Sequence, residues 1–234
     1  MFALHRSPGS ARRSWLAFEV TESSWRVRII LLESPWLWLQ GKAWLGGAIV
    51  LWDRAEVVSR LNFLQRADPG FTRFGSAKHR YLLNQPLAQS EVTAFEARYA
   101  VSLPEDYRSF LLEVGDGGAG PFYGIFRLDR SHLSARDDLL PGFLAGEFPH
   151  AKPWNDVGDN GPDSEEEYFD PAHICGSLNL SHQGCGYMVR LVLNGPQRGT
   201  LWEDGRCSDT GITPFAPGFA AWYLRWLNDP QRPG

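Results

Sequence analysis

Two residues with nucleophile and base chemistry stand close together in the chain, His182 and Cys185. A thiolate beside an imidazole can attack an acyl carbon, which is the chemistry of cysteine hydrolases. Such pairs normally draw their two members from distant segments, whereas only a predicted tight turn separates these two. The favoured interpretation is therefore a turn histidine and a small cysteine at a strand end, with a Cys/His enzyme as the alternative.

Adjacent carboxylates, Glu203 and Asp204, form the second candidate group. Two carboxyl groups can divide acid and base roles when they share one site. Successive side chains of a strand point to opposite faces, so this pair is not expected to share one. The sequence also contains no GxSxG, HExxH, Walker or dinucleotide-binding motif. We therefore expect a protein that is not an enzyme and that uses no cofactor.

Metal chemistry is not expected either. The three cysteines, Cys175, Cys185 and Cys207, form no CxxC pair and match no common zinc spacing. Three cysteines are too few for a secreted disulfide framework, and an odd number cannot all pair. We therefore expect reduced thiols and a cytoplasmic protein. The acidic stretch around Asp159 lacks the ligand ladder of a calcium-binding EF-hand loop.

That acidic stretch is the candidate partner-binding surface. Between residues 156 and 170 the chain carries several Asp and Glu and not one Lys or Arg. The residues proposed for binding are Asp156, Asp159, Asp163, Glu165, Glu166 and Glu167, with Trp154 as an anchor. A solvated loop is the simplest interpretation of such a run. The alternative interpretation is an acidic surface that attracts a basic protein and speeds its association. Trp154 suits the core equally well.

Charge and tryptophan are distributed unevenly along the chain. Residues 1–52 carry a net charge of +3 and six of the ten tryptophans, and residues 53–234 carry −7. An acidic main body argues against nucleic acid as a partner, because phosphates call for clustered Lys and Arg. The apolar stretch over residues 27–52 is interrupted by Glu33, Pro35 and Lys42. It is too broken for a membrane-spanning helix, and a membrane surface is the less favoured partner.

We divide the chain into a Trp-rich leader over residues 1–55, a domain over 56–229 and a tail over 230–234. The leader shows neither helical nor strand periodicity. One hypothesis is that translation begins near residue 56, at a non-AUG codon such as that of Val57 or Val58. Mass spectrometry of the native N-terminus tests this hypothesis, and peptides from before Trp52 would exclude it.

Helical periodicity marks four segments of the main body. Apolar residues at i, i+3, i+4 and i+7 predict helices over residues 55–66, 90–99, 104–114 and 219–227. Ser90 is the expected N-cap of the second helix. Gly115 is expected to close the third helix in a left-handed conformation.

Strands are predicted between the third and fourth of these helices. The glycine-rich run over residues 116–121 follows a helix and lacks a Lys-Ser/Thr pair, so it is expected to connect a helix to a strand and not to bind phosphate. Turn residues at 181–184 and 194–196 separate apolar runs. The predicted strands are residues 122–128, 174–180, 187–193 and 199–203. Helices on both sides of antiparallel strands indicate an α+β fold.

Two separated blocks of the sequence resemble the core signature of the SUKH superfamily. The first runs from Leu103-Pro104-Glu105-Asp106-Tyr107 through the glycine-rich run to Gly124. The second runs from Gly176-Ser177-Leu178 through residues 182–187 and 191–196 to Trp202, and Pro153-Trp154-Asn155 matches as well. The resemblance covers residues 56–229 and leaves the leader unmatched.

This superfamily includes fungal cell-wall-assembly regulators and bacterial immunity proteins that neutralise polymorphic toxins. The resemblance implies a curved, mostly antiparallel sheet flanked by helices, and it brings no catalytic residues with it. On this basis we expect an immunity protein that binds a cognate toxin, for example a basic nuclease. The alternative is a regulatory protein-interaction module without a toxin.

Overall fold

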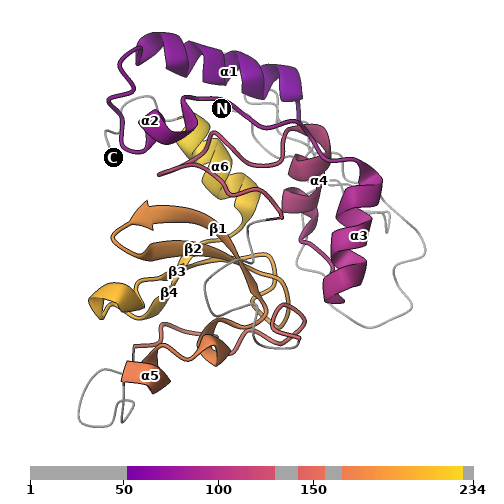
Figure 1. Cartoon of the computed structure of the whole chain (residues 1–234), viewed down its shortest axis with the longest axis vertical. Coiled ribbons are helices and arrows are strands. Elements are labelled where there is room, and N and C mark those ends of the chain that lie inside the picture. Colours follow the sequence, from indigo (N-terminus) through magenta and orange to yellow (C-terminus); the bar gives the residue numbers. More distant parts are fainter. Residues whose placement is uncertain (1–51, 130–141, 156–164, 229–234) are drawn as a thin grey trace, which may run out of the picture.

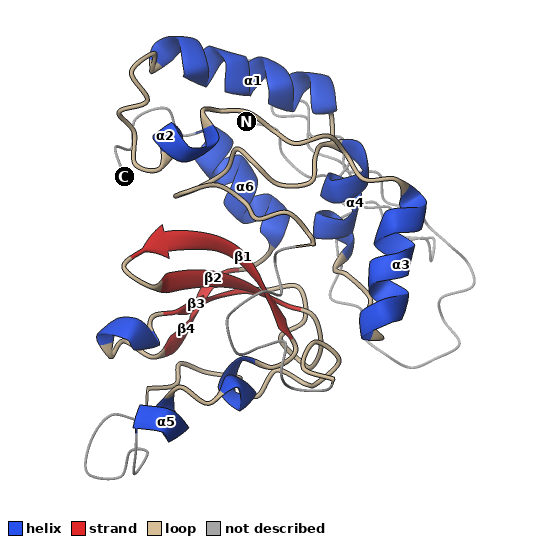
Figure 2. Cartoon of the chain, in the orientation of Figure 1, coloured by secondary structure: helices blue, strands red, loops and turns tan. Residues whose placement is uncertain are grey.

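The computed structural model describes residues 52–129, 142–155 and 165–228 (Figure 1). Within these ranges an open antiparallel sheet has the strand order β1-β2-β3-β4. Its strands are β1 (Ser177–Gly184), β2 (Tyr187–Val192), β3 (Leu201–Asp204) and β4 (Ile212–Ala216). Figure 2 shows the longer helices gathered on one side of the sheet, with the short α5 at the opposite side. The α+β fold predicted from the sequence is confirmed.

The four predicted helices are present, and two short ones were not predicted. In chain order they are α1 (Arg54–Ala67), α2 (Ser76–His79), α3 (Gln89–Tyr99), α4 (Glu105–Glu113), α5 (Glu165–Tyr168) and α6 (Phe219–Asn228). The predicted helices carry an apolar stripe that the core covers. A one-turn helix such as α2 is too short to show such periodicity, which is why the sequence did not reveal it.

Two predicted helix caps are wrong. Ser90 lies inside α3, whose first turn is instead closed by Glu91, because the Glu91 carboxylate accepts a hydrogen bond from the Ala88 backbone N–H at 2.8 Å. Gly115 follows α4 without a positive φ. The glycine is needed for another reason: a Cβ there would lie 2.6 Å from the Asn84 carbonyl oxygen. Position 115 therefore requires glycine because two backbone segments approach closely there, and not because the chain turns in a left-handed conformation.

The strand predicted over residues 122–128 does not form. Only isolated bridges exist there, with Ile125 pairing to Gly118 and to Ser181. Phe122 and Gly124 have positive φ values of 54° and 92°, and these break the extended conformation that a strand requires. The segment instead forms a compact corner that lies against the end of β1.

The first strand of the meander is shifted relative to its prediction. Residues 171–174 form a 3₁₀ turn, and β1 begins at Ser177 and continues through the predicted turn to Gly184. The hairpin turn consists of Cys185 and Gly186, with φ values of 49° and 88°. Positive φ at both central residues is the requirement of the two-residue type I′ turn, which suits hairpins. The strand β4 was not predicted.

Aromatic rings of α4 and α6 form the core beside the sheet. Phe110 lies 4.9 Å from Phe219 and 4.8 Å from Tyr223, measured between ring centroids. Trp52 joins them, at 5.2 Å from Phe110, and its Nε1–H donates to the Asp106 carbonyl at 3.0 Å. Trp52, which falls in the leader predicted over residues 1–55, is therefore part of this core.

None of the helices in residues 52–129, 142–155 and 165–228 has the length and apolar character needed to cross a bilayer.

Candidate functional site

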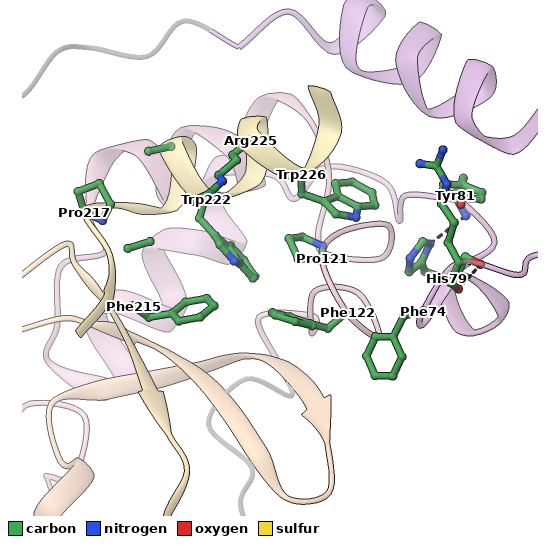
Figure 3. A pocket seen from close by; sticks show the side chains of 14 residues that line it. Phe74, His79, Tyr81, Pro121, Phe122, Phe215, Pro217, Trp222, Arg225 and Trp226 are labelled. Carbon is green, nitrogen blue, oxygen red and sulfur yellow. Dashed lines mark hydrogen bonds between the residues drawn. The ribbon is translucent and has the colours of Figure 1, made fainter. Parts of the chain in front are cut away.

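A cavity of about 670 Å³ opens between α6 on one side and β4 with the segments around α2 and Pro121 on the other (Figure 3). Its walls carry large apolar rings and an exposed arginine. We call it the aromatic groove and define it by Phe74, Phe122, Phe215, Trp222, Arg225 and Trp226. Its volume falls in the range of sites that take a small ligand or the side chains of a protein segment, about 300–1,000 Å³.

Helix α6 forms one wall because its two faces have different neighbours. Phe219 and Tyr223 point into the core and are fully buried. Trp222, Arg225 and Trp226 follow the i, i+3, i+4 spacing of the adjacent face and line the groove. The sequence pattern predicts the helix from one aromatic stripe and does not separate its core residues from the tryptophans that line the groove.

Phenylalanines from three separate segments form the opposite wall. The Phe122 ring lies 6.5 Å from Phe74 and 6.3 Å from Phe215, and Phe74 lies 5.0 Å from Tyr123. Figure 3 shows Phe215, Phe122 and Phe74 in a row. Phe74 remains 40% exposed and Phe215 37% exposed. Large apolar side chains left open side by side are typical of surfaces that bind another molecule.

A buried carboxylate holds the loop that carries Phe74. Asp68 accepts hydrogen bonds from the Thr72 backbone N–H at 2.8 Å, the Ser76 hydroxyl at 3.1 Å and the Tyr81 hydroxyl at 2.8 Å. Burial opposes ionisation of Asp68, but the hydrogen bonds from Thr72 and Tyr81 outweigh it and hold the pKa of this carboxyl well below its usual range. Burial and the same hydrogen bond raise the pKa of Tyr81 to about 12.

Unusual backbone conformations concentrate beside the groove. Seven non-glycine residues in the described ranges have positive φ. Tyr81 and Phe122 line the groove, Arg80 precedes Tyr81, and the Phe71 ring lies 6.3 Å from that of Tyr81. Such conformations persist only where the surroundings over-determine them, and they cluster at functional sites. Gly75 shows how tight this packing is, because a Cβ at its φ of 77° would collide with the Phe122 carbonyl.

His79 connects the two walls. Its Nδ1 accepts a hydrogen bond from the Tyr81 backbone N–H at 3.0 Å, and its ring meets Trp226 edge-on with centroids 5.8 Å apart. Burial lowers the pKa of His79 to about 4. The ring is therefore neutral near pH 7 and carries its proton on Nε2, since Nδ1 is an acceptor.

The predicted anchor Trp154 lies away from the groove, in a stack of rings. Its centroid is 4.1 Å from His173 and 5.4 Å from Tyr168, and its backbone N–H donates to the Ile212 carbonyl at 2.9 Å. The side chain is half-buried. These contacts give Trp154 a packing role that joins residues 165–175 to β4.

The predicted acidic surface is described only in part. Glu165, Glu166 and Glu167 are exposed on α5, and Asp156, Asp159 and Asp163 lie outside the described residues. In Figure 1, α5 lies at the opposite end of the sheet from α2.

The buried Arg206 fixes the end of α5 to the sheet. Its guanidinium donates to the Tyr168 carbonyl at 3.1 Å and forms a two-pronged pair with Asp204 at 2.8 and 2.9 Å. A carboxylate and a main-chain carbonyl thus share one cation, which holds the last residue of α5 close to β3.

The catalytic candidates are not brought together. His182 stacks on Tyr123 with centroids 5.6 Å apart, and Cys185 is exposed in the hairpin turn. In the part of the chain that the structure describes, no hydrogen bond joins the two. Glu203 accepts from the Gln183 amide at 2.8 Å while Asp204 faces Arg206, so these neighbours do lie on opposite faces. The described residues also contain no group of three or more His, Cys, Asp or Glu placed to hold a metal.

Comparison with known proteins identifies the family. The model of the SMI1 / KNR4 family (SUKH-1) matches residues 86–225, which is more than half of the chain. The matched region contains both sequence blocks that resemble the SUKH superfamily and the groove residues Phe122, Phe215 and Trp222. No curated protein matches the sequence. The chain belongs to the SMI1 / KNR4 family (SUKH-1).

Proposed function

We propose that this SUKH-1 chain is a non-enzymatic protein-binding module, specifically an immunity protein that neutralises a cognate toxin by direct binding. The aromatic groove carries the proposal, because it leaves Phe74 and Phe215 open beside the half-buried Trp226. Partly exposed aromatic side chains around a hollow are the usual anchors of protein interfaces. The toxin link comes from the resemblance to immunity proteins, and the free thiols of the described cysteines favour a cytoplasmic location.

The test is binding and protection with the product of the neighbouring gene. The double variant Phe74→Ala/Phe215→Ala removes exposed rings and leaves the core intact. We expect it to weaken binding by about tenfold or more, since removal of an interface anchor typically costs over 1 kcal/mol. A host that expresses the toxin should then lose protection. Titration calorimetry and host survival measure the two effects.

Phe63→Ala is the matched control. Phe63 is 46% exposed on α1 and does not line the groove, so its removal should leave binding and protection unchanged. Wild-type binding by the double variant would place the interface elsewhere. Failure of the wild-type protein to protect the host would remove the toxin link.

A regulatory interaction module is the second candidate function. It shares the groove but lacks a toxin, and a gene that stands alone would favour it. An enzyme that uses Cys185 and His182 is the least supported alternative, because the structure does not pair the two side chains. Cys185→Ala should leave the function of the protein unchanged. A loss of function in this variant would support the enzyme hypothesis.

A further inference from the structure

The aromatic groove carries positive charge on an acidic protein. The chain has a formal net charge of −4, yet the described residues that line the groove include Arg73 and Arg225 and no Asp or Glu. The ionised Asp68 does not line it, but it accepts hydrogen bonds from Ser76 and Tyr81, which do, and its single negative charge offsets only one of the two arginines. The local charge of the groove is therefore opposite in sign to that of the whole molecule.

Arg225 is the cation placed to meet a partner. It is exposed, and it projects from α6 between Trp222 and Trp226 in the i, i+3, i+4 series that lines the groove. Among the described residues it has no hydrogen-bond or ion-pair partner. A guanidinium has five donors in a planar fork that fits a carboxylate with two parallel hydrogen bonds. Beside apolar rings, such a pair is shielded from water and gains strength.

The apolar surface extends beyond the cavity. The Phe74 ring contacts Tyr123 at 5.0 Å, and Tyr123 in turn stacks on His182 at 5.6 Å. Tyr123 and His182 do not line the cavity, so the row of rings continues past it and suits a stretch of polypeptide better than a compact small molecule.

We propose that the groove binds a segment of a partner protein in which a large apolar residue is flanked by an Asp or Glu. The apolar side chain enters between Trp226 and Phe122, and the carboxylate pairs with Arg225. This inference rests on the proposed function and adds the chemistry of the partner. The groove is expected to bind an acidic segment, in place of the basic partner that the acidic residues near α5 suggest.

The test is selection of a random peptide library on phage against the full chain. We expect peptides selected by the wild-type protein to combine an aromatic or long aliphatic residue with a neighbouring Asp or Glu, and to lose binding to the Phe74→Ala/Phe215→Ala variant. Arg225→Glu should select peptides with Lys or Arg at the acidic position. Arg66→Glu is the matched control, because Arg66 is likewise an exposed arginine in the last turn of a helix, α1.

Fluorescence polarisation then measures the charge preference directly. A selected peptide whose Asp or Glu is changed to Lys should bind the wild-type protein at least about tenfold more weakly, and Arg225→Glu should restore its binding. Groove-dependent peptides without acidic residues, or a preference unchanged by Arg225→Glu, would overturn the acidic segment and leave the proposed function standing. If no peptide depends on Phe74 and Phe215, the groove does not bind a linear segment. Toxin binding, measured separately, then decides the proposed function.

Discussion

His79 contributes to the groove through a single neutral ring. Its Nδ1 accepts a hydrogen bond from the Tyr81 backbone N–H, and its ring makes a T-shaped contact with Trp226. Protonation of Nδ1 would remove the acceptor and place a charge beside apolar rings. The wall that carries Tyr81 and the wall that carries Trp226 would then lose their shared contact.

A pH-dependent stability follows from this. The pKa of His79 is about 4 in the folded protein against an ordinary value of 6.5, so the unfolded chain binds more protons between these values. Stability should therefore fall as the pH is lowered from 6.5 toward 4. His79→Gln keeps a hydrogen-bond acceptor and removes the titration, so its stability should fall less over the same window. Denaturant unfolding at a series of pH values measures the difference, and parallel curves for the two proteins would contradict it.

At the scale of elements, α1 is fastened to the core by the residues that precede it. Asp53 caps the helix by accepting from the Glu56 backbone N–H at 3.1 Å, and Trp52 packs edge-on against Phe110, Phe219 and Tyr223. A chain that began at residue 56 would lack both contributions. The hypothesis of a start near residue 56 therefore carries a stability cost that can be measured.

Trp52→Ala should lower the free energy of unfolding by about 3 kcal/mol or more, because it empties a buried aromatic site. Phe63→Ala on the same segment removes an exposed ring and should change it by less than about 1 kcal/mol. Equilibrium urea unfolding measures both values. If Trp52→Ala were as mild as the control, Trp52 would not belong to the domain core.

The acidic helix α5 allows a separate prediction about partner charge. If a basic partner docks there, Glu165→Lys/Glu166→Lys/Glu167→Lys should slow association by about tenfold at low salt, since steering depends on surface charge. A control with the same change in net charge is Glu56→Lys/Glu105→Lys/Glu113→Lys, whose side chains are exposed on α1 and α4 or partly so. Stopped-flow mixing with the partner compares the rates, and equal rates for both variants would exclude a role specific to α5.

The sequence revealed helices better than strands for a physical reason. The stripe of Val57, Leu61 and Leu64 repeats within one helix, so the neighbours that bury it need not be known. The extent of a strand depends on its partner: β1 continues to Gly184 because Tyr187 pairs with it, although residues 181–184 look like a turn. Ile125 likewise forms only single bridges, because the left-handed residues around it prevent a second strand.

At the scale of the whole molecule, the aromatic groove could not be predicted from the sequence. Phe74, Phe122 and Phe215 come from three segments without shared periodicity, and only tertiary folding brings their rings together. The tryptophans of α6 lie in the same helical stripe as its core residues, and nothing in the spacing of this stripe distinguishes the buried Tyr223 from the half-buried Trp226. Composition did reveal the acidic run, whose described part, Glu165 to Glu167, is exposed as such a run should be.

The molecule presents two surfaces of opposite charge at its two ends. The exposed glutamates of α5 lie at one end of the sheet, and the aromatic groove with Arg225 lies toward the end that carries α2 and α6 (Figure 1). A partner that touched both would need a complementary separation of charge, acidic where it enters the groove and basic where it meets α5. The charge-reversal variants of Arg225 and of α5 examine the two ends independently.

The contact between Gly75 and the Phe122 carbonyl has a kinetic consequence. Gly75 allows two segments that lie far apart in the chain to pack closely, because a larger residue would collide with the Phe122 carbonyl, and we therefore expect the phenylalanine wall to form without a partner. A preformed surface loses little conformational freedom on association and needs no opening step. The lifetime of the complex, more than the speed of its formation, should then respond to changes in the groove rings.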